Sequence, residues 1–520
     1  METKKSTHPV KTLRLILGDQ LNGNHSWFKT MDDSVTYVLM EVRTETDYVW
    51  HHIQKVAGFF AAMQNFAKEL RNQNHDVFYI YLNDENNLQS FDKNISALIE
   101  KHQFNHFEYL LPDEYRVDQN LRKYVESLSI SHQVYDTEHF FAKREELGNF
   151  FKGKKAFLME SFYRYMRKKH HILMQSEDEP LTGQWNYDGD NRKKLPAKHK
   201  ATTPLIFNND VSQIVAEIRK TDIKTIGIID PENFLWPVNR KQALTLLEFF
   251  VHECLPLFGT YQDAMTPHEW SLYHSRISFA MNTKMLSPLE AIDRATDEWK
   301  NRQTEISFNQ LEGFVRQIIG WREYMRGIYW LKMPEFKSYN FLDHQNKLPD
   351  WYWTGKTRMN CLKHAILQSL NFAYAHHIQR LMITGNFALL AGVHPDAVDQ
   401  WYLGIYIDAL QWVEITNTRG MSQFADGGII GTKPYVSSAT YIDKMSLYCN
   451  SCYYNKSKKT GEKACPFNSL YWNFYDRHQA KLAKNPRIGM MYNIWNKMQP
   501  EARTELLKQA AYYLKNVDQL

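Results

Sequence analysis

The first quarter of the chain alternates short apolar runs with stretches of helical spacing. Apolar runs of strand length occupy residues 13–17, 37–42, 77–82 and 109–111, and residues 49–71 repeat apolar side chains at helical intervals. Strands that alternate with helices favour right-handed crossovers and a parallel sheet covered by helices. We therefore predict an α/β domain of the doubly wound type over residues 1–135.

The pattern then changes twice. Residues 136–235 are irregular and predict a long connector on the surface of its neighbours, a length that is uncommon unless functional. From residue 236 the spacing is helical almost throughout, and long helices are expected at residues 307–331, 357–384, 396–413 and 500–516. Ser287, Pro288 and Glu290 predict the start of a further helix, as N-cap, first-turn proline and capping-box glutamate. We predict an all-α domain over residues 236–520.

Ligands on a doubly wound sheet bind at the carboxyl ends of its strands. In this sequence those ends are the turn of Gly18, Asp19 and Gln20 and the stretch at residues 41–45. The turn lacks a GxGxxG pattern, so a dinucleotide in this domain is not supported.

Composition agrees with several domains, because 520 residues are too many for one core. Aromatic residues make up 14% of the chain, which is typical of large helical cores and also of proteins that stack flat ligands or move electrons. The net charge of +5 is small, but one region is strongly basic. Its basic residues are Arg164, Arg167, Lys168, Lys169, Arg192, Lys193, Lys194, Lys198 and Lys200. They predict either a solvated basic face or a track for a phosphate backbone.

The first 20 residues lack the apolar segment of a signal peptide, and the apolar run at residues 381–393 is shorter than the about 20 residues of a membrane span. We expect a cytoplasmic protein with no membrane partner. In a reducing compartment, a Cys-x2-Cys pair indicates metal or cluster ligation instead of disulfides.

Four of the five cysteines form such a set. Cys449 and Cys452 make the Cys-x2-Cys pair, Cys465 follows after twelve residues and precedes a proline, and Cys361 lies far upstream. Four thiolates suit a structural zinc ion or a [4Fe-4S] cluster, and the spacing does not separate the two. Cys254 lies in an apolar stretch and is expected to be a buried small hydrophobe.

Two groups of titratable side chains are candidates for chemistry. His376 and His377 are expected in the middle of a helix, pointing about 100° apart, as one packed and one surface histidine or as a general acid. Asp408 is flanked by apolar residues and is expected to be a buried carboxylate that meets a ligand or an arginine. Glu414 lies six residues further on. Trp353, Trp401, Tyr402 and Trp412 would be core aromatics unless a redox cofactor lies nearby.

Taken together, these motifs resemble the photolyase and cryptochrome family. Ser275 to Ser278 are similar to its FAD-phosphate motif, the Trp321-Arg322-Glu323 run to its Trp-Arg-Glu helix, and Asp408 with Glu414 to its flavin-contacting pair. Within the family, the four cysteines and the runs at residues 375–387 and 420–428 resemble the iron–sulfur bacterial branch, also described as prokaryotic (6-4) photolyases.

The resemblance implies an antenna-type α/β domain, a connector and an FAD-binding helical domain. It implies three cofactors: FAD, a [4Fe-4S] cluster and a 6,7-dimethyl-8-ribityllumazine antenna. The implied FAD contacts are Ser275, Ser278, Gln317, Arg322, Asn386, Asp408 and Glu414. The implied cluster ligands are Cys361, Cys449, Cys452 and Cys465. The antenna candidates are Gly18, Asp19, Gln20, Glu45 and Lys55, with Phe59 where smaller aliphatic residues also occur.

The resemblance also implies roles in the reaction. The electron route would use Trp401, Trp353 and Tyr402. The catalytic and lesion-facing set would be His377, His376, Arg380, Tyr435 and Tyr441, with Leu381 and Met421 on the same wall. Asp188 and Asp190 resemble carboxylates linked to Mg²⁺ dependence.

The implied activity is light-dependent repair of (6-4) photoproducts in UV-damaged DNA by a monomer. An electron from reduced FAD would reach a flipped lesion, and His377 would donate a proton. The alternative is a cryptochrome-like photoreceptor with the same cofactors, while a light-independent flavoenzyme lacks any substrate motif.

Overall fold

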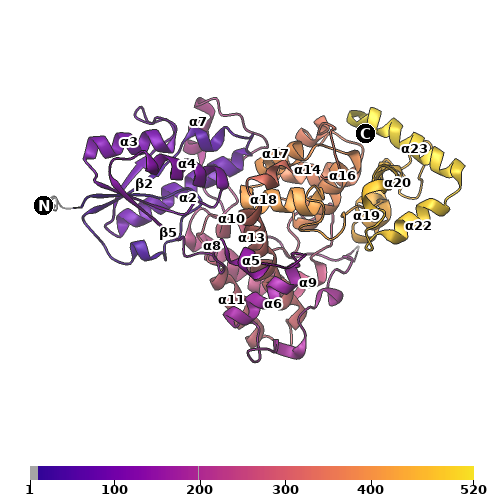
Figure 1. The fold of residues 1–520 in the computed structure, drawn as a ribbon, viewed down its shortest axis with the longest axis horizontal. Coiled ribbons are helices and arrows are strands. Elements are labelled where there is room, and N and C mark those ends of the chain that lie inside the picture. Colours follow the sequence, from indigo (N-terminus) through magenta and orange to yellow (C-terminus); the bar gives the residue numbers. More distant parts are fainter. Residues whose placement is uncertain (1–9, 197) are drawn as a thin grey trace.

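The computed structural model describes residues 10–196 and 198–520. The α/β domain lies at one end of the molecule and helices α20–α23 lie at the other (Figure 1). The strands are β1 (Thr12–Leu15), β2 (Val35–Met40), β3 (Asp76–Ile80), β4 (His106–Leu110) and β5 (Ser131–Tyr135). They form one parallel sheet in the order β3-β2-β1-β4-β5. The predicted doubly wound domain is confirmed. The absence of a signal segment was predicted partly from residues 1–9, which lie outside the described residues.

Apolar side chains cover both faces of this sheet. Leu13, Leu15 and Val38 pack with residues of α3 (Phe91–His102) and α4 (Tyr115–Glu126) on one face. Leu39 packs on the other face with α2 (Ile53–Asn72). Burial on both faces explains the nearly continuous apolar runs of the inner strands. The polar strand β5 was not predicted, because it lies at the sheet edge and is mostly exposed.

The connector is more ordered than its irregular pattern predicted. It contains α5 (Glu146–Phe150), α6 (Met159–His170) and α7 (Ser212–Lys220). Helix α7 contacts α2, and α6 contacts the π-helical segment η6 (Arg316–Arg322). Phe162 and Tyr163 of α6 are fully buried. The connector therefore packs into the core and joins the two domains.

The remaining chain is helical, as predicted. Its longer helices are α8 (Arg240–Phe249), α11 (Pro288–Asn301), α12 (Phe308–Val315), α13 (Glu323–Lys332), α14 (Asn360–Phe372), α17 (Pro395–Ile405), α20 (Pro466–Arg477), α22 (Gly489–Lys497) and α23 (Pro500–Lys515). Ser287 caps α11 in a capping box with Glu290, as expected. Segments η6, η9 (Arg380–Gly385) and η10 (Thr416–Ser422) are π-helical, a geometry frequent at functional sites.

Two of the expected long helices are broken, which corrects two predictions. Helix α14 ends at Phe372, where Ala373 takes a left-handed conformation with φ 51°, and α15 (His377–Gln379) begins anew. His376 and His377 therefore lie at a helix start instead of mid-helix. Helix α17 ends at Ile405 and α18 (Gln411–Ile415) follows, so Asp408 lies in the intervening turn.

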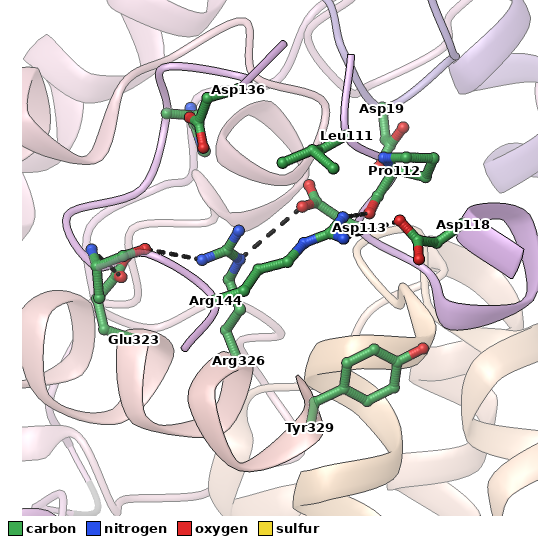
Figure 2. A network of polar contacts seen from close by, with 12 residues as sticks. Asp19, Leu111, Pro112, Asp113, Asp118, Asp136, Arg144, Glu323, Arg326 and Tyr329 are labelled. Carbon is green, nitrogen blue, oxygen red and sulfur yellow. Dashed lines mark hydrogen bonds and ion pairs between the residues drawn. The ribbon is translucent and has the colours of Figure 1, made fainter. Parts of the chain in front are cut away.

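A buried charge network joins the two domains (Figure 2). Lys284, after α10 (Ser278–Asn282), contacts Asp113, after β4, at 2.5 Å, and its Nζ donates to the Asp19 carbonyl oxygen at 2.5 Å. Arg326 of α13 lies 3.9 Å from the second Asp113 oxygen. Arg144 of the connector pairs with Asp118 of α4 at 2.8 Å. Pairing of this kind offsets the cost of removing these charges from water.

One helical stretch, Arg240–Tyr261, is long and apolar enough for a membrane span by length and composition alone. Leu246, Leu247 and Phe250 within it lie in the largest core cluster. The stretch is therefore packed as a core helix, and Cys254 within it is buried as expected.

Candidate functional site

The turn between α17 and α18 is the centre of the candidate site. Ser278 Oγ donates to Asp408 Oδ2 at 2.6 Å, and the Asn282 amide donates to the Asp408 carbonyl oxygen at 2.7 Å. Arg380 lies 3.0 Å from the Asp408 carboxylate. The prediction that Asp408 meets a ligand or an arginine is confirmed. Oδ1 of Asp408 has no hydrogen-bond partner of good geometry among residues 10–196 and 198–520, and it is buried.

Arg380 is held from several directions. Its Nε donates to the Ala375 carbonyl oxygen at 2.6 Å, and its guanidinium lies 3.8 Å from the centre of the Tyr406 ring. The carboxylate and the aromatic ring together fix the orientation of the guanidinium group, and an arginine side chain stays positively charged. The break after α14 makes this possible, because it places Ala375 beside the first turn of η9.

The two predicted histidines differ sharply in their surroundings. His376 is buried, and its ring stacks on that of His274 at 4.5 Å and 9°. Burial, then the neighbouring His274, lowers the pKa of His376 well below its usual value. His377 is exposed, yet desolvation by the surrounding protein and then the charges of Arg380 and Arg192 lower its pKa to about 4. Of the pair, only His377 can meet a large substrate.

The connector reaches this site through Arg192. Its positive charge lowers the pKa of His377, and it also opposes the burial that raises the pKa of Tyr435 and of Tyr441. Arg192 pairs with Asp188 at 2.7 Å and lies 3.6 Å from Asp263. Tyr435 and Tyr441 are half-buried. The structure thus gathers the predicted lesion-facing residues near a connector arginine.

The basic region divides into two parts. Arg167 is fully buried and donates to the Leu173 carbonyl oxygen, so its assignment to a basic face is wrong. Three further residues of α6 are paired with acids, namely Arg164 with Glu160, Lys168 with Asp178 and Lys169 with Glu146. Lys193, Lys194, Lys198 and Lys200 are exposed beside Arg192. These four are the residues best placed to meet a polyanion.

The predicted electron-route aromatics lie close together inside the helical domain. Trp401 is fully buried, its indole N–H donates to the Tyr352 carbonyl oxygen at 3.0 Å, and its ring lies 5.1 Å from that of Tyr402. Trp353 follows Tyr352 directly in η8 (Asp350–Trp353). The Tyr402 hydroxyl donates to the Arg380 carbonyl oxygen at 2.6 Å, which ties this group to the Asp408 turn.

Glu414 is buried in α18 and accepts a hydrogen bond from Thr418. Burial, then the nearby Asp399 carboxyl, raises the pKa of Glu414 well above its usual value. A raised pKa favours the protonated form of such a carboxyl, which can then donate a proton.

The other predicted FAD contacts are more scattered. Ser275 is half-buried and Gln317 is exposed, so both can meet a ligand. The Asn386 amide is fully buried and is engaged by the backbone and hydroxyl of Ser437. Arg322 lies between the rings of Phe140 and Trp412 and contacts His139 at 3.1 Å. It also donates to Asn282 Oδ1 at 3.4 Å, so it reaches the Asp408 turn only through Asn282. The structure brings Ser278, Asp408 and Arg380 into direct contact, but not these residues.

A cavity of about 120 Å³ lies at the carboxyl ends of the strands. It lies between the ends of β1 and β4, where the chain changes the direction in which successive strands are added to the sheet. This is the usual place for a ligand in this fold. Its lining includes the predicted Gly18, Asp19, Glu45, Lys55 and Phe59, together with His51, Asp113, Glu114 and Leu410. Gln20 is not in the lining, because its amide accepts from the Leu17 N–H and donates to the Leu110 carbonyl oxygen.

Two features fix the polar lining of this cavity. Arg116 holds both oxygens of Glu45, at 2.8 and 2.7 Å. Lys55 donates to the carbonyl oxygens of Leu403 and Ala409, at 2.8 and 2.6 Å, and burial lowers the pKa of Lys55 to about 8. Because Ala409 adjoins Asp408, the cavity and the turn at the candidate site share one wall.

Sequence reasoning missed several residues of this cavity, among them His51, Asp113 and Glu114. Both ring nitrogens of His51 are buried without a partner within the described part of the chain, so they are free for a ligand. Asp113 and Glu114 lie three and four residues after the end of β4, and the strand-end rule could have found them. For His51 the sequence holds no comparable signal.

The four predicted cysteines surround one cavity. Cys361 begins α14, Cys449 and Cys452 lie in and after η11 (Tyr448–Ser451), and Cys465 caps α20. Within the described ranges, no three His, Cys, Asp or Glu side chains are placed to hold one metal ion. A single zinc ion needs each sulfur at about 2.3 Å, whereas a cluster of several atoms is held by four thiolates at its corners. Four cysteine thiols around one cavity are a donor set that suits either group.

The fold is that of the photolyase and cryptochrome class. A bacterial class III photolyase from Agrobacterium tumefaciens matches with a TM-score of 0.59 and 12% identity, over 99% of this chain and 100% of that one. A cryptochrome from Synechocystis sp. PCC6803 matches with a TM-score of 0.54 and 13% identity, over 80% and 83%. At these identities the likeness concerns the fold alone.

Sequence comparison is more specific. The family described as deoxyribodipyrimidine photo-lyase-related protein matches residues 14–234. A (6-4) photolyase from Agrobacterium fabrum (strain C58) is 41% identical over 515 residues, which cover 98% of this chain and 100% of the relative. The chain belongs to the family of this (6-4) photolyase. Membership in the photolyase and cryptochrome class implies FAD as a cofactor.

Proposed function

We propose that this protein repairs (6-4) photoproducts in UV-damaged DNA with light. The observation that carries the proposal is the exposed His377 beside the fixed Arg380, with Tyr435, Tyr441 and Arg192 around them. The full-length similarity to a protein named (6-4) photolyase supports the same lesion.

FAD would be held in the helical domain by the Asp408 turn. Asp408, the half-buried Ser275 and the exposed Gln317 offer polar contacts to it. When bound, FAD supplies light-driven electron transfer. The raised pKa of Glu414 favours its protonated form, so this carboxyl would hold a proton near the flavin ring.

The cluster and antenna belong to the same proposal. Cys361, Cys449, Cys452 and Cys465 would hold a [4Fe-4S] cluster. A ribityllumazine would enter the cavity at the strand ends, where the unpartnered His51 can contact its polar edge. Asp188 and Asp190 lie beside Arg192 and are candidates for a Mg²⁺ ion at the DNA interface.

DNA would bind across Arg192 and the exposed lysines that follow it. Phosphate contacts by such residues position DNA without reading its sequence. A damaged base pair is already weakened, so its extrusion costs least. Tyr435, Tyr441 and Arg380 would orient the flipped lesion, with Leu381 and Met421 as its apolar wall.

His377 would donate the proton that the rearranging lesion needs. In the protein without DNA its low pKa favours the neutral ring. The negative phosphates of bound DNA oppose the effect of Arg380 and Arg192 and raise this pKa, so binding would charge the histidine. Because the charged ring is the donor, repair by the complex is expected to weaken as pH rises above this raised pKa.

The test uses an oligonucleotide with a single (6-4) photoproduct, reduced flavin-loaded protein, and blue light or darkness. A cyclobutane dimer is the parallel substrate. We expect intact pyrimidines only from the (6-4) lesion and only in light, and loss of repair with photoreduction intact in His377→Ala. His376→Ala tests the neighbouring position. No turnover of either lesion by protein shown to hold FAD would contradict the proposal and favour a photoreceptor.

A further inference from the structure

Trp50 is an exposed indole at the junction of the two domains. It lies between α1 (Arg43–Thr46) and α2 of the α/β domain and is 51% exposed. Its ring meets that of Trp353, from the helical domain, edge to face at a centroid distance of 5.6 Å. A single exposed aromatic needs no explanation, but a ring contact with a predicted electron-route residue does.

The backbone holds Trp50 against the helix that carries Trp401. The His52 N–H donates to the Gly404 carbonyl oxygen of α17 at 2.8 Å. A Cβ at Gly404 would lie 2.3 Å from the Trp50 carbonyl oxygen, so only glycine permits this approach. The position of Trp50 is therefore fixed relative to Trp401.

A second series of aromatic contacts begins at Tyr352, the residue that precedes Trp353 in η8. Tyr352 meets the Trp401 ring at 5.1 Å, and Trp401 meets Tyr402 at 5.1 Å. Tyr402 meets Tyr406 at 5.6 Å, and the Tyr406 ring lies under Arg380, the partner of Asp408. The peptide bond between Tyr352 and Trp353 joins the exposed Trp50 contact to this inner series, which ends at the turn of the candidate site.

Proton chemistry distinguishes the two ends. The N–H of the buried Trp401 is bonded to a carbonyl oxygen, which is too weak a base to take its proton when the indole is oxidised. Trp401 would therefore stay a radical cation and recover an electron from an outer ring. At Trp50 water can take the proton, so an oxidised ring there becomes a neutral radical within reach of reductants in solution.

We propose that Trp50 is the outer electron donor of the relay, where reducing equivalents enter the protein. The proposal rests on the FAD site proposed above. One electron passes from Trp401 to the cofactor. Trp353 then reduces the oxidised Trp401, and Trp50 reduces the oxidised Trp353. Trp50 releases its indole proton to water, and a thiol in solution returns one electron while water returns the proton. No other bond is made or broken in the protein.

The test compares Trp50→Phe with the wild type in flavin-loaded protein illuminated in the presence of a thiol. Phenylalanine keeps an aromatic ring against Trp353 but is far harder to oxidise. The photoreduction rate is expected to fall about tenfold, equal to roughly 1.4 kcal/mol in the barrier. Trp299→Phe is the matched control, because Trp299 is half-exposed and contacts Phe308 at 5.3 Å, and its rate should be unchanged.

A second measurement is independent of turnover. After long illumination without thiol, peptide mass spectrometry of the wild type should find added oxygen at Trp50, and in Trp50→Phe at Trp353. Unchanged photoreduction in Trp50→Phe, or oxidation of other tryptophans alone, would overturn the proposal, as would wild-type protein that holds FAD but is not photoreduced.

A repair assay on chemically reduced protein tests the proposed function independently of the proposed role of Trp50. Trp50→Phe protein that has been reduced chemically should repair the lesion at the wild-type rate. Failure of chemically reduced wild type to repair would instead count against the proposed function.

Discussion

Removal of the Lys284 charge should destabilise the protein strongly. The side chains of Lys284 and Asp113 are 1% and 2% exposed. If one of them is removed, the charged group of the other therefore cannot be solvated by water. Burial would raise the pKa of Asp113, but Lys284 and then Arg326 outweigh it and hold this pKa below its usual value. Asp113 is therefore charged at neutral pH. In Lys284→Met, Asp113 would keep Arg326 as an ion-pair partner, at the longer distance of 3.9 Å (Figure 2).

The magnitude follows from the asymmetry of buried pairs. Loss of one partner costs about 3–5 kcal/mol, whereas replacement of both by apolar groups of similar volume is often neutral. We expect Lys284→Met to lower the free energy of unfolding by about 4 kcal/mol, and Lys284→Met with Asp113→Leu to restore most of it.

Urea unfolding, followed by circular dichroism, measures the total change. Because the chain has more than one domain, hydrogen exchange at β1 and α10 should show that protection is lost first on the two sides of the network. A single variant within about 1 kcal/mol of wild type, or a double variant less stable than the single, would refute this account of the network.

Three further predictions follow from the cavities and the buried histidines. Cys452→Ser should lower the iron content of protein purified without oxygen, whereas Cys254→Ala should keep it, because Cys254 is buried away from the four-cysteine cavity. Phe59→Ala should increase binding of ribityllumazine, measured by fluorescence titration, since the present 120 Å³ is below the about 300 Å³ of small ligand pockets. Stability should fall as pH drops from about 6.5 toward 4, because burial lowers the pKa of His52 to about 4 and of His274 to about 3, so only the unfolded chain takes up these protons.

Each of these has a contrary outcome. Equal iron in both cysteine variants would remove Cys452 from the ligand set. Unchanged lumazine affinity would mean that Phe59 does not limit the cavity. A melting temperature that does not change between pH 6.5 and 4 would mean that these rings take up protons without unfolding. The same would follow if His52→Gln and the wild type lost stability equally as the pH falls.

The sequence was sufficient for the elements with strong periodicity and for the chemistry tied to short motifs. β1 to β4 and α11 carry their patterns in their own residues, and the four cysteines do meet in one cavity. Strand β5 was missed because an edge strand need not be apolar. The break at Ala373 was missed because neither glycine nor proline marks it; packing of Ala375 against Arg380 accompanies it.

Contacts between distant segments were beyond sequence reasoning. Nothing local to Lys284 indicates that its partner is Asp113, 171 residues away, and nothing local to Arg192 indicates His377. The contact of Arg322 with His139, 183 residues away, is a result of the same kind. Such contacts depend on how the domains dock, which no window of the sequence contains.

The interdomain network also sets an order of events during synthesis. The ribosome makes Asp113 171 residues before Lys284, and at 5–20 residues per second the gap is roughly 10–30 seconds. In that interval the nascent α/β domain carries Asp19 and Asp113 on an uncovered surface, where their charges stay hydrated. The same carboxylates that later join the domains would thus keep the nascent α/β domain in solution before the helical domain docks. A chain that ends before Lys284 could not form the interdomain ion pair.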